Sequence, residues 1–234
     1  MMNKPELVIF DCDGVLIDSE ILSSRTLSEA LRRAGVDLSP MDVHLHFTGK
    51  SERDIRLICE DEYGLTNTDA VFASWRETIY QAFEKDLQPM AGMPDLVRSL
   101  QVKKSVASNS RYERLLLSLG RTVLWENLAP HVYGADSVKN PKPAPDLLLH
   151  CAVLHDVRPE ASVMIDDSPH GISAAIAAGM MPIGFIDLND PRPNREMILR
   201  KAGAAHIANG AEELGDILHM LGCMREFVPD EMSS

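Results

Sequence analysis

The sequence is poor in cysteine, and its four cysteines form no Cys-x-x-Cys pair. They stand far apart, at Cys12, Cys59, Cys151 and Cys223. This spacing argues against a disulfide framework and against a zinc site, and it is typical of a reducing compartment. A chain of 234 residues can bury a substantial core without such cross-links.

Positive charge and long apolar segments are also scarce. Lysine and arginine total 23 against 35 acidic residues, a formal net charge of −12. Because no basic patch offsets this charge, we expect no nucleic-acid partner. No apolar run approaches a membrane span, and the residues before Asp11 do not resemble a secretory signal. The expectation is a cytoplasmic protein of enzyme size without a membrane partner, monomeric or weakly self-associating.

Short apolar runs separated by helical patterns make up most of the chain. Runs of this length are typical of buried parallel strands. Strands that alternate with helices predict the α/β class, with a doubly wound parallel sheet and right-handed crossovers. The predicted strands are Leu7–Phe10, Ser105–Ala107, Ser162–Ile165 and Pro182–Ile186, with a weaker one at Val132–Gly134.

The stretch from about residue 17 to residue 88 breaks this alternation, because its apolar residues recur at helical spacing. A helical segment this long between two strands predicts an inserted α-helical cap domain. Its helices are predicted around Leu27–Ala34, from Ser51 to about Gly64, and over Ala70–Lys85. The predicted division is a core of residues 1–16 and 89–227, a cap of residues 17–88, and a tail of residues 228–234.

Polar residues follow several of the predicted strands. In an open α/β sheet, ligands bind beyond the carboxyl ends of the strands, so these residues are expected to meet at one edge. They are Asp11 and Asp13, then Ser108 and Asn109, then Lys142, and finally Asp166 and Asp167.

Each of these residue types has a use in phosphoryl transfer. The carboxylate of Asp11 can act as a nucleophile, and Asp13 can give a proton to the leaving oxygen. Carboxylate oxygens of Asp11, Asp166 and Asp167 suit Mg²⁺, which prefers hard oxygen ligands. The Lys142 ammonium can neutralise charge on the transferred group, while the Ser108 hydroxyl donates hydrogen bonds to it.

The order and spacing of these segments resemble the haloacid dehalogenase superfamily. The closest resemblance is to its phosphatase branch with a small helical cap, which includes proteins of the phosphoglycolate phosphatase and beta-phosphoglucomutase type. The segments that carry the resemblance are Asp11-Cys12-Asp13-Gly14-Val15-Leu16, Asp18-Ser19-Glu20, Ser108-Asn109-Ser110, Lys142-Pro143 and Ile165-Asp166-Asp167-Ser168.

The resemblance implies a role for each matched residue. Asp11 would be the nucleophile and a metal ligand, and Asp13 the acid/base, with its main-chain carbonyl on the metal. Asp166 and Asp167 would complete a Mg²⁺ site. Ser108 and Asn109 would hold the phosphoryl group, and Lys142 would steady it. Gly49 and Lys50 match a cap loop that approaches the substrate in the family.

Several alternatives follow from the same residues. Halide-removing relatives lack the second aspartate, so Asp13 favours phosphate chemistry. Mutases such as beta-phosphoglucomutase carry a histidine and an arginine where this chain has Ser23 and Glu52, which favours a phosphatase over a mutase. A phospho-receiver module places paired acids after its first strand and the phosphorylated aspartate, the hydroxyl and the lysine on later strands. This chain instead runs Asp, Ser, Lys and then Asp-Asp, and it is about twice a receiver's length, which argues against a receiver.

Two further features are interpreted as structural. Cys12 lies between two carboxylates, which raise a thiol pKa, so we expect it to serve in packing. His44 and His46 have a metal-ligand spacing, but no third ligand is evident nearby. The substrate is expected to be a small phosphorylated metabolite: a sugar phosphate, a sugar-acid phosphate or phosphoglycolate.

Overall fold

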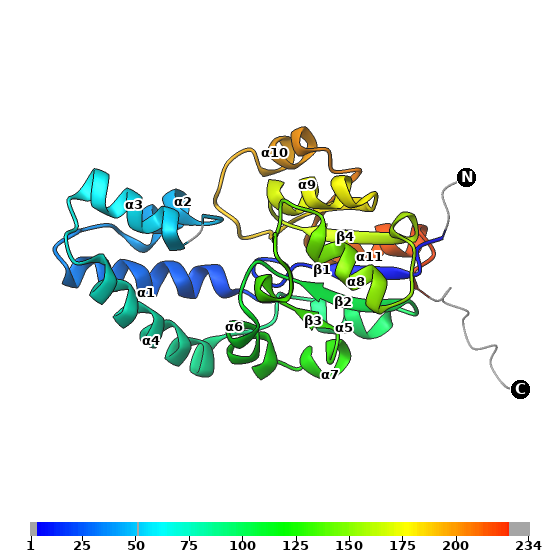
Figure 1. The fold of residues 1–234 in the computed structure, drawn as a ribbon, viewed down its shortest axis with the longest axis horizontal. Coiled ribbons are helices and arrows are strands. Elements are labelled where there is room, and N and C mark those ends of the chain that lie inside the picture. The colour runs from blue at the N-terminus through cyan, green and yellow to red at the C-terminus, as the bar shows by residue number, and fades with distance from the viewer. Residues whose placement is uncertain (1–3, 51, 225–234) are drawn as a thin grey trace, which may run out of the picture.

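The computed structural model describes residues 4–50 and 52–224, and within them six parallel strands form one sheet with helices on both faces (Figure 1). The sheet order is β3-β2-β1-β4-β5-β6. Strands β2 and β3 are added on one side of β1 and strands β4 to β6 on the other, so the order of the strands reverses between β1 and β4. The predicted α/β, doubly wound class is confirmed. The strands are β1 (Leu7–Phe10), β2 (Lys103–Ala107), β3 (Val132–Tyr133), β4 (Ser162–Asp166), β5 (Met181–Ile186) and β6 (His206–Asn209).

Alternate residues of each strand face opposite sides of the sheet, as the two-residue period of a strand requires. Leu7 and Ile9 pack in one apolar cluster with α8 (Asp146–Leu154) and α9 (Pro169–Ala178). Val8 and Phe10 pack in the other cluster, which contains residues of α5 (Met93–Ser99) and α11 (Gly210–Met220). These four β1 residues are completely buried, which explains their unbroken apolar run.

The remaining core helices lie towards the two edges of the sheet. They are α6 (Tyr112–Leu117), α7 (Trp125–Leu128) and α10 (Arg195–Ala202). The edge strand β6 was not predicted, because its sequence His-Ile-Ala-Asn has no continuous apolar run. Within residues 4–50 and 52–224, no helix combines the length and the apolar character needed to cross a membrane.

Four of the five helices between β1 and β2, α1 to α4, lie together at one end of the molecule, beside the α/β body (Figure 1). Helices α1 and α4 pack along each other, and α2 packs against α1. The helix α2 was not predicted, although Ser39 and Asp42 form a reciprocal capping box at its start. The helices are α1 (Ser19–Arg33), α2 (Pro40–Phe47), α3 (Glu52–Tyr63) and α4 (Thr68–Asp86).

Two short segments join this helical cap to the body, and they run side by side. The amide of Asp18 donates to the carbonyl of Gln88 at 3.1 Å. The amide of Met90 donates to the carbonyl of Leu16 at 2.8 Å. Ile17 and Pro89 form an antiparallel bridge between them. The exact domain bounds stay a prediction, and Ser51 and the tail at 228–234 lie outside the described residues.

Candidate active site

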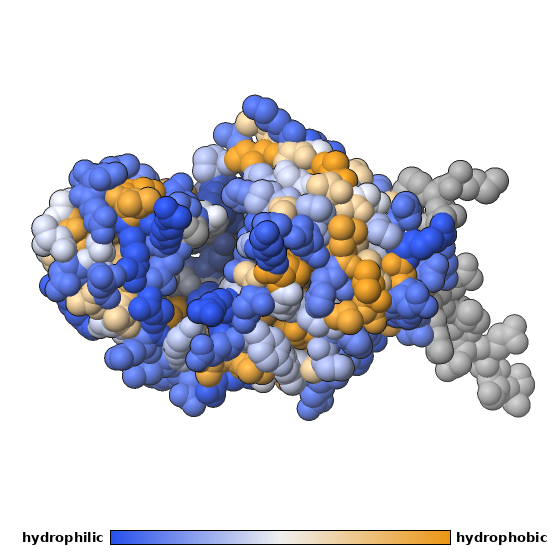
Figure 2. Space-filling model, in the orientation of Figure 1, coloured by the Kyte–Doolittle hydropathy of each residue, from blue (hydrophilic) through white to orange (hydrophobic). Residues whose placement is uncertain are grey.

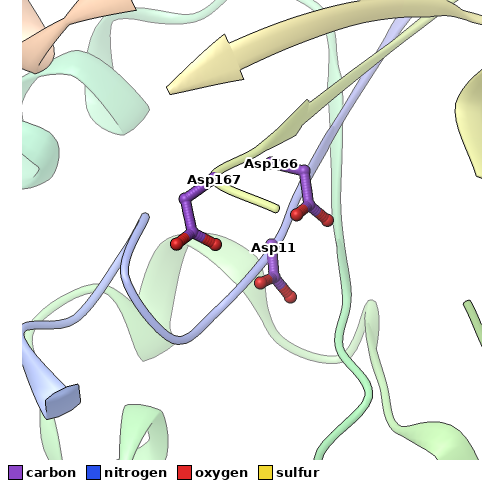
Figure 3. A group of neighbouring side chains, drawn as sticks. All are labelled: Asp11, Asp166 and Asp167. Atoms are coloured by element: carbon purple, nitrogen blue, oxygen red, sulfur yellow. The ribbon is translucent and has the colours of Figure 1, made fainter. Parts of the chain in front are cut away.

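Three carboxylates meet where β1 and β4 end, because these strands are neighbours in the sheet. Asp11 directly follows β1, and its amide donates to the carbonyl of Ile165 at 2.8 Å. Asp166 ends β4, and Asp167 follows it. Oxygen atoms of these three aspartates lie within 4.8 Å of one another, and their side chains turn towards a shared space (Figure 3). The strand ends therefore bring together the acidic residues that the sequence predicted.

Lys142 reaches this acidic cluster from the loop between β3 and α8. Its Nζ donates to Asp11 Oδ1 at 2.9 Å and to Asp166 Oδ2 at 2.7 Å, and its side chain is 3% exposed. Burial acts to lower the pKa of Lys142, but the two carboxylates outweigh it and hold the pKa above its ordinary value. The ammonium therefore stays charged and offsets the repulsion between Asp11 and Asp166.

The carboxylate of Asp166 is fixed from its other side by the start of α9. Its Oδ1 accepts hydrogen bonds from the amide and the hydroxyl of Ser168, at 2.8 and 2.7 Å. Gly171, in the first turn of α9, packs directly against this side chain. A Cβ atom at Gly171 would lie 1.7 Å from Asp166 Oδ2, so this helix position has no room for a side chain.

Asp13 lies in a different set of contacts from Asp11. It accepts hydrogen bonds from Ser19 Oγ at 2.5 Å, Ser110 Oγ at 2.8 Å and Arg114 Nη2 at 3.1 Å. Burial acts to raise the pKa of Asp13, but Arg114 and the two hydroxyl donors outweigh it and lower the pKa. Asp13 is therefore ionised in this arrangement and ready to accept a proton. To donate one, it must first move away from these donors.

Asn109 holds the loop that carries Lys142. Its side-chain amide donates to the carbonyl of Lys142 at 2.8 Å, and its Oδ1 accepts from the amide of Lys142 at 3.0 Å. The neighbouring Ser108 is 2% exposed, and its Oγ accepts from the amide of Ser110 at 3.1 Å. The contact between these two side chains and a phosphoryl group stays a prediction, whereas the clamp on Lys142 was not predicted.

A cleft of about 1010 Å³ opens in front of these residues, between the cap and the body (Figure 2). This volume suits a small-molecule ligand. Helix α4 contributes Trp75, Arg76 and Tyr80 to the wall opposite the carboxylates. Asp166 is fully buried and lies behind the cleft surface. The other predicted site residues all line the cleft: Asp11, Asp13, Gly49, Lys50, Ser108, Asn109, Lys142 and Asp167.

Two arginines that the sequence did not single out also reach the site. Arg114 contacts Asp13, and it lies one helical turn after Ser110. Arg192, between β5 and α10, places a guanidinium nitrogen 3.3 Å from Asp167 Oδ2. Burial and Asp166 raise the pKa of Asp167 to about 6, against the opposing effect of Arg192 and Arg195. In the sequence, the prolines on either side of Arg192 indicate a loop. They do not indicate that Arg192 contacts Asp167.

Cys12, His44 and His46 have the following surroundings in the structure. Cys12 is fully buried, and burial, with Asp13 and Asp11, holds its thiol pKa well above the ordinary value. His44 lies 3.3 Å from Ser24 Oγ, and His46 lies 3.4 Å from Glu62 Oε2. Among the described residues, neither histidine belongs to a group of three or more side chains with metal-ligand spacing.

Comparison with known proteins gives the family of this α/β fold. The model of the haloacid dehalogenase-like hydrolases matches residues 8–185. The chain therefore belongs to this family. With its phosphatase relatives, this membership makes it a phosphoric monoester hydrolase.

Three comparisons cover most of the chain. It is 29% identical to the 6-phosphogluconate phosphatase of Escherichia coli over 76% of this chain and 81% of the relative. It is 28% identical to the phosphorylated carbohydrates phosphatase of Thermotoga maritima over 92% of this chain and 100% of the relative. The solved structure of a haloacid dehalogenase-like protein from Agrobacterium tumefaciens superposes with a TM-score of 0.84. The identity there is 31%, over 93% of this chain and 99% of that one.

Proposed function

We propose that this protein is a Mg²⁺-dependent phosphatase that releases phosphate from a small phosphorylated metabolite through an aspartyl-phosphate on Asp11. The observation that carries the proposal is the buried Lys142, whose ammonium bridges Asp11 and Asp166 beside the cleft. Attack on an anionic phosphate needs a carboxylate beside a fixed positive charge, and the contact between Lys142 and Asp11 supports Asp11 as the proposed nucleophile.

The donor set fits a hard divalent cation. Asp11, Asp166 and Asp167 offer carboxylate oxygens within 4.8 Å of one another, and oxygen ligands are those that Mg²⁺ prefers. These three residues, with the main-chain carbonyl of Asp13, would hold the ion. When bound, Mg²⁺ would neutralise part of the negative charge between the nucleophile and the phosphate.

The proposed reaction has two steps, and the chain supplies both groups that change bonds. In the first, an oxygen of Asp11 bonds to phosphorus, the bond to the leaving oxygen breaks, and that oxygen takes a proton from Asp13. Asp13 has moved away from Ser19, Ser110 and Arg114 beforehand and taken this proton from water. In the second, water attacks phosphorus, gives its proton to Asp13, and breaks the bond to Asp11. Inorganic phosphate leaves, and both aspartates return to their starting states.

The surrounding residues bind and position the transferred group. Lys142 offsets charge on the phosphoryl oxygens, and Ser108 and Asn109 are proposed to donate hydrogen bonds to them. Gly49 and Lys50, in the cap wall of the cleft, are proposed to contact the rest of the substrate. Closure of the cap over this cleft would exclude water and strengthen these electrostatic contacts.

The substrate class we propose is a sugar phosphate, a sugar-acid phosphate or phosphoglycolate. The relatives named for 6-phosphogluconate and for phosphorylated carbohydrates support it, as does the size of the cleft. A cytoplasmic location and a monomeric or weakly self-associating state are proposed from the sequence.

The test is a phosphate-release assay over a panel of phosphorylated metabolites, with and without Mg²⁺. Phosphate release should require Mg²⁺, stop when EDTA is added, and fall to background in Asp11→Asn. Asp216→Asn removes one exposed carboxylate on α11 and should keep full activity. Full activity of Asp11→Asn would refute the mechanism, and isomerisation of a hexose 1-phosphate without phosphate release would favour a mutase.

A further inference from the structure

Arg192 contacts carboxylates from three different parts of the molecule. Its Nη2 lies 2.7 Å from Asp190 Oδ2 in its own loop, 3.3 Å from Asp167 Oδ2 in the acidic cluster, and 3.3 Å from Glu20 Oε2. Glu20 lies in the first turn of α1, the helix that begins the cap. The side chain of Arg192 is 13% exposed, so these contacts lie largely out of solvent, where charge interactions are strong.

The loop that carries Arg192 also contacts the cap at a second helix. His44 of α2 has its Nε2 3.7 Å from Asp190 Oδ1, and both side chains are less than a tenth exposed. The Nε of Arg195 lies 3.3 Å from Asp190 Oδ2, and its Nη2 donates to the main-chain carbonyl of Asp167. A continuous chain of polar contacts therefore runs from His44 of α2 through Asp190 and Arg192 to Asp167.

There is space between the cap and this loop for a small movement. A cavity of about 220 Å³ lies there, and its lining includes Ile21 and Met41 from the cap and Pro191 and Arg192 from the loop. This space leaves room for α1 and α2 to approach the loop. Protein interiors without such a cavity resist movement of this kind.

We propose that Arg192 is a positioning residue that couples the placement of the helical cap to the carboxylate of Asp167. The guanidinium orients Asp167 within the acidic cluster. The same guanidinium also contacts Glu20 and Asp190. A cation that takes up negative charge of Asp167 leaves more of the Arg192 charge to Glu20 and Asp190, which draws α1 and α2 towards the loop. Because coupling is reciprocal, the cap in turn affects cation binding at Asp167.

The inference rests on the proposed Mg²⁺ site, and its test measures Mg²⁺ binding directly. Calorimetric titration with Mg²⁺ alone should give a dissociation constant about 10-fold lower for Arg192→Gln than for wild type, because the guanidinium no longer competes with the cation for Asp167. Arg192→Lys should be intermediate, because an ammonium lacks the fork that reaches several carboxylates. The matched control is Arg200→Gln, which removes an exposed arginine paired with Glu196 on α10 and should bind Mg²⁺ like wild type.

Hydrogen exchange distinguishes coupling from a local effect on the site. Mg²⁺ without substrate should slow amide exchange in α2 of the wild type and of Arg200→Gln, but not of Arg192→Gln. If Arg192→Gln fails to fold, Arg192→Lys with wild-type affinity and wild-type exchange would still overturn the inference. Unchanged Mg²⁺ affinity in Arg192→Gln overturns the inference, and so does slower α2 exchange on adding Mg²⁺ to this variant. Either result leaves the proposed function untouched. A wild type that does not bind Mg²⁺ overturns the metal part of the proposed function as well.

Discussion

Replacing Gly171 by alanine puts a methyl group into the space that the Asp166 carboxylate occupies. The added Cβ would lie 1.7 Å from Oδ2 and 1.9 Å from Cγ of Asp166. Asp166 cannot move aside easily, because Ser168 holds one oxygen and Lys142 the other. Either the aspartate leaves its contacts, or the first turn of α9 shifts away from β4.

The size of the effect follows from opposing contributions. In a helix interior, alanine is favoured over glycine by about 1 kcal/mol. Overpacking a close-packed site costs about 1–3 kcal/mol, and disturbing a buried ion pair adds up to about 3–5 kcal/mol. With the ion pair disturbed, we therefore expect Gly171→Ala to lose about 3–7 kcal/mol of unfolding free energy, or about 6–28 °C in Tm for a domain of this size. Phosphate release should fall with it, because Asp166 and Lys142 are displaced together.

Urea unfolding and the phosphate-release assay measure the two effects separately. Gly215→Ala is the matched control, since Gly215 also lies inside a helix, and its added Cβ would meet the flexible end of Leu96 at 3.2 Å. The control should keep its activity and lose less than about 1 kcal/mol. Wild-type stability and activity in Gly171→Ala would show that Asp166 does not lie against α9 as described.

Two further predictions concern Asn109 and Asp167. Asn109→Ala should lower kcat by about 10–100-fold with a smaller change in KM, because the loop that positions Lys142 is released. Asn140→Ala, which removes an exposed contact in that loop, should stay near wild type; equal losses in both variants would contradict the clamp. Burial and Asp166 raise the pKa of Asp167 to about 6, so the metal-free folded protein binds a proton there that the unfolded chain has released. This contribution to stability should therefore fall between about pH 4 and pH 6, by up to about 3 kcal/mol. Urea unfolding in EDTA at both pH values should show a fall that is larger in wild type than in Asp167→Asn, since Asp11 and Glu20, whose pKa values burial also raises, contribute in both. The same pH dependence in both proteins would refute the prediction.

The sheet and its acidic edge could be predicted because local sequence determines them. A run such as Leu7–Phe10 is apolar because β1 is buried on both faces, and this is visible without tertiary information. Once the strands are known to be parallel, their carboxyl ends must share an edge. Asp11, Lys142 and Asp166 therefore follow from strand order alone, even though their exact partners do not.

The parts that could not be predicted depend on contacts between distant segments. Arg192 is 172 residues from Glu20 along the chain, and nothing near either residue indicates that they meet. The clamp of Asn109 on Lys142 likewise joins two loops, and it requires the three-dimensional path of both. The helix α2 differs, because its capping box at Ser39 and Asp42 is a local signal that the sequence itself carries.

The two paired segments that join the cap to the body have an evolutionary consequence. Because residues 16–18 and 88–90 lie beside each other, the inserted helices begin and end at nearly the same place. A segment with adjacent ends can be lengthened, shortened or exchanged while β1 and β2 keep their pairing. Substrate range can then diverge through the cap while the catalytic chemistry is inherited unchanged, and chimaeras joined at Ile17 and Pro89 are a natural way to transfer specificity between relatives.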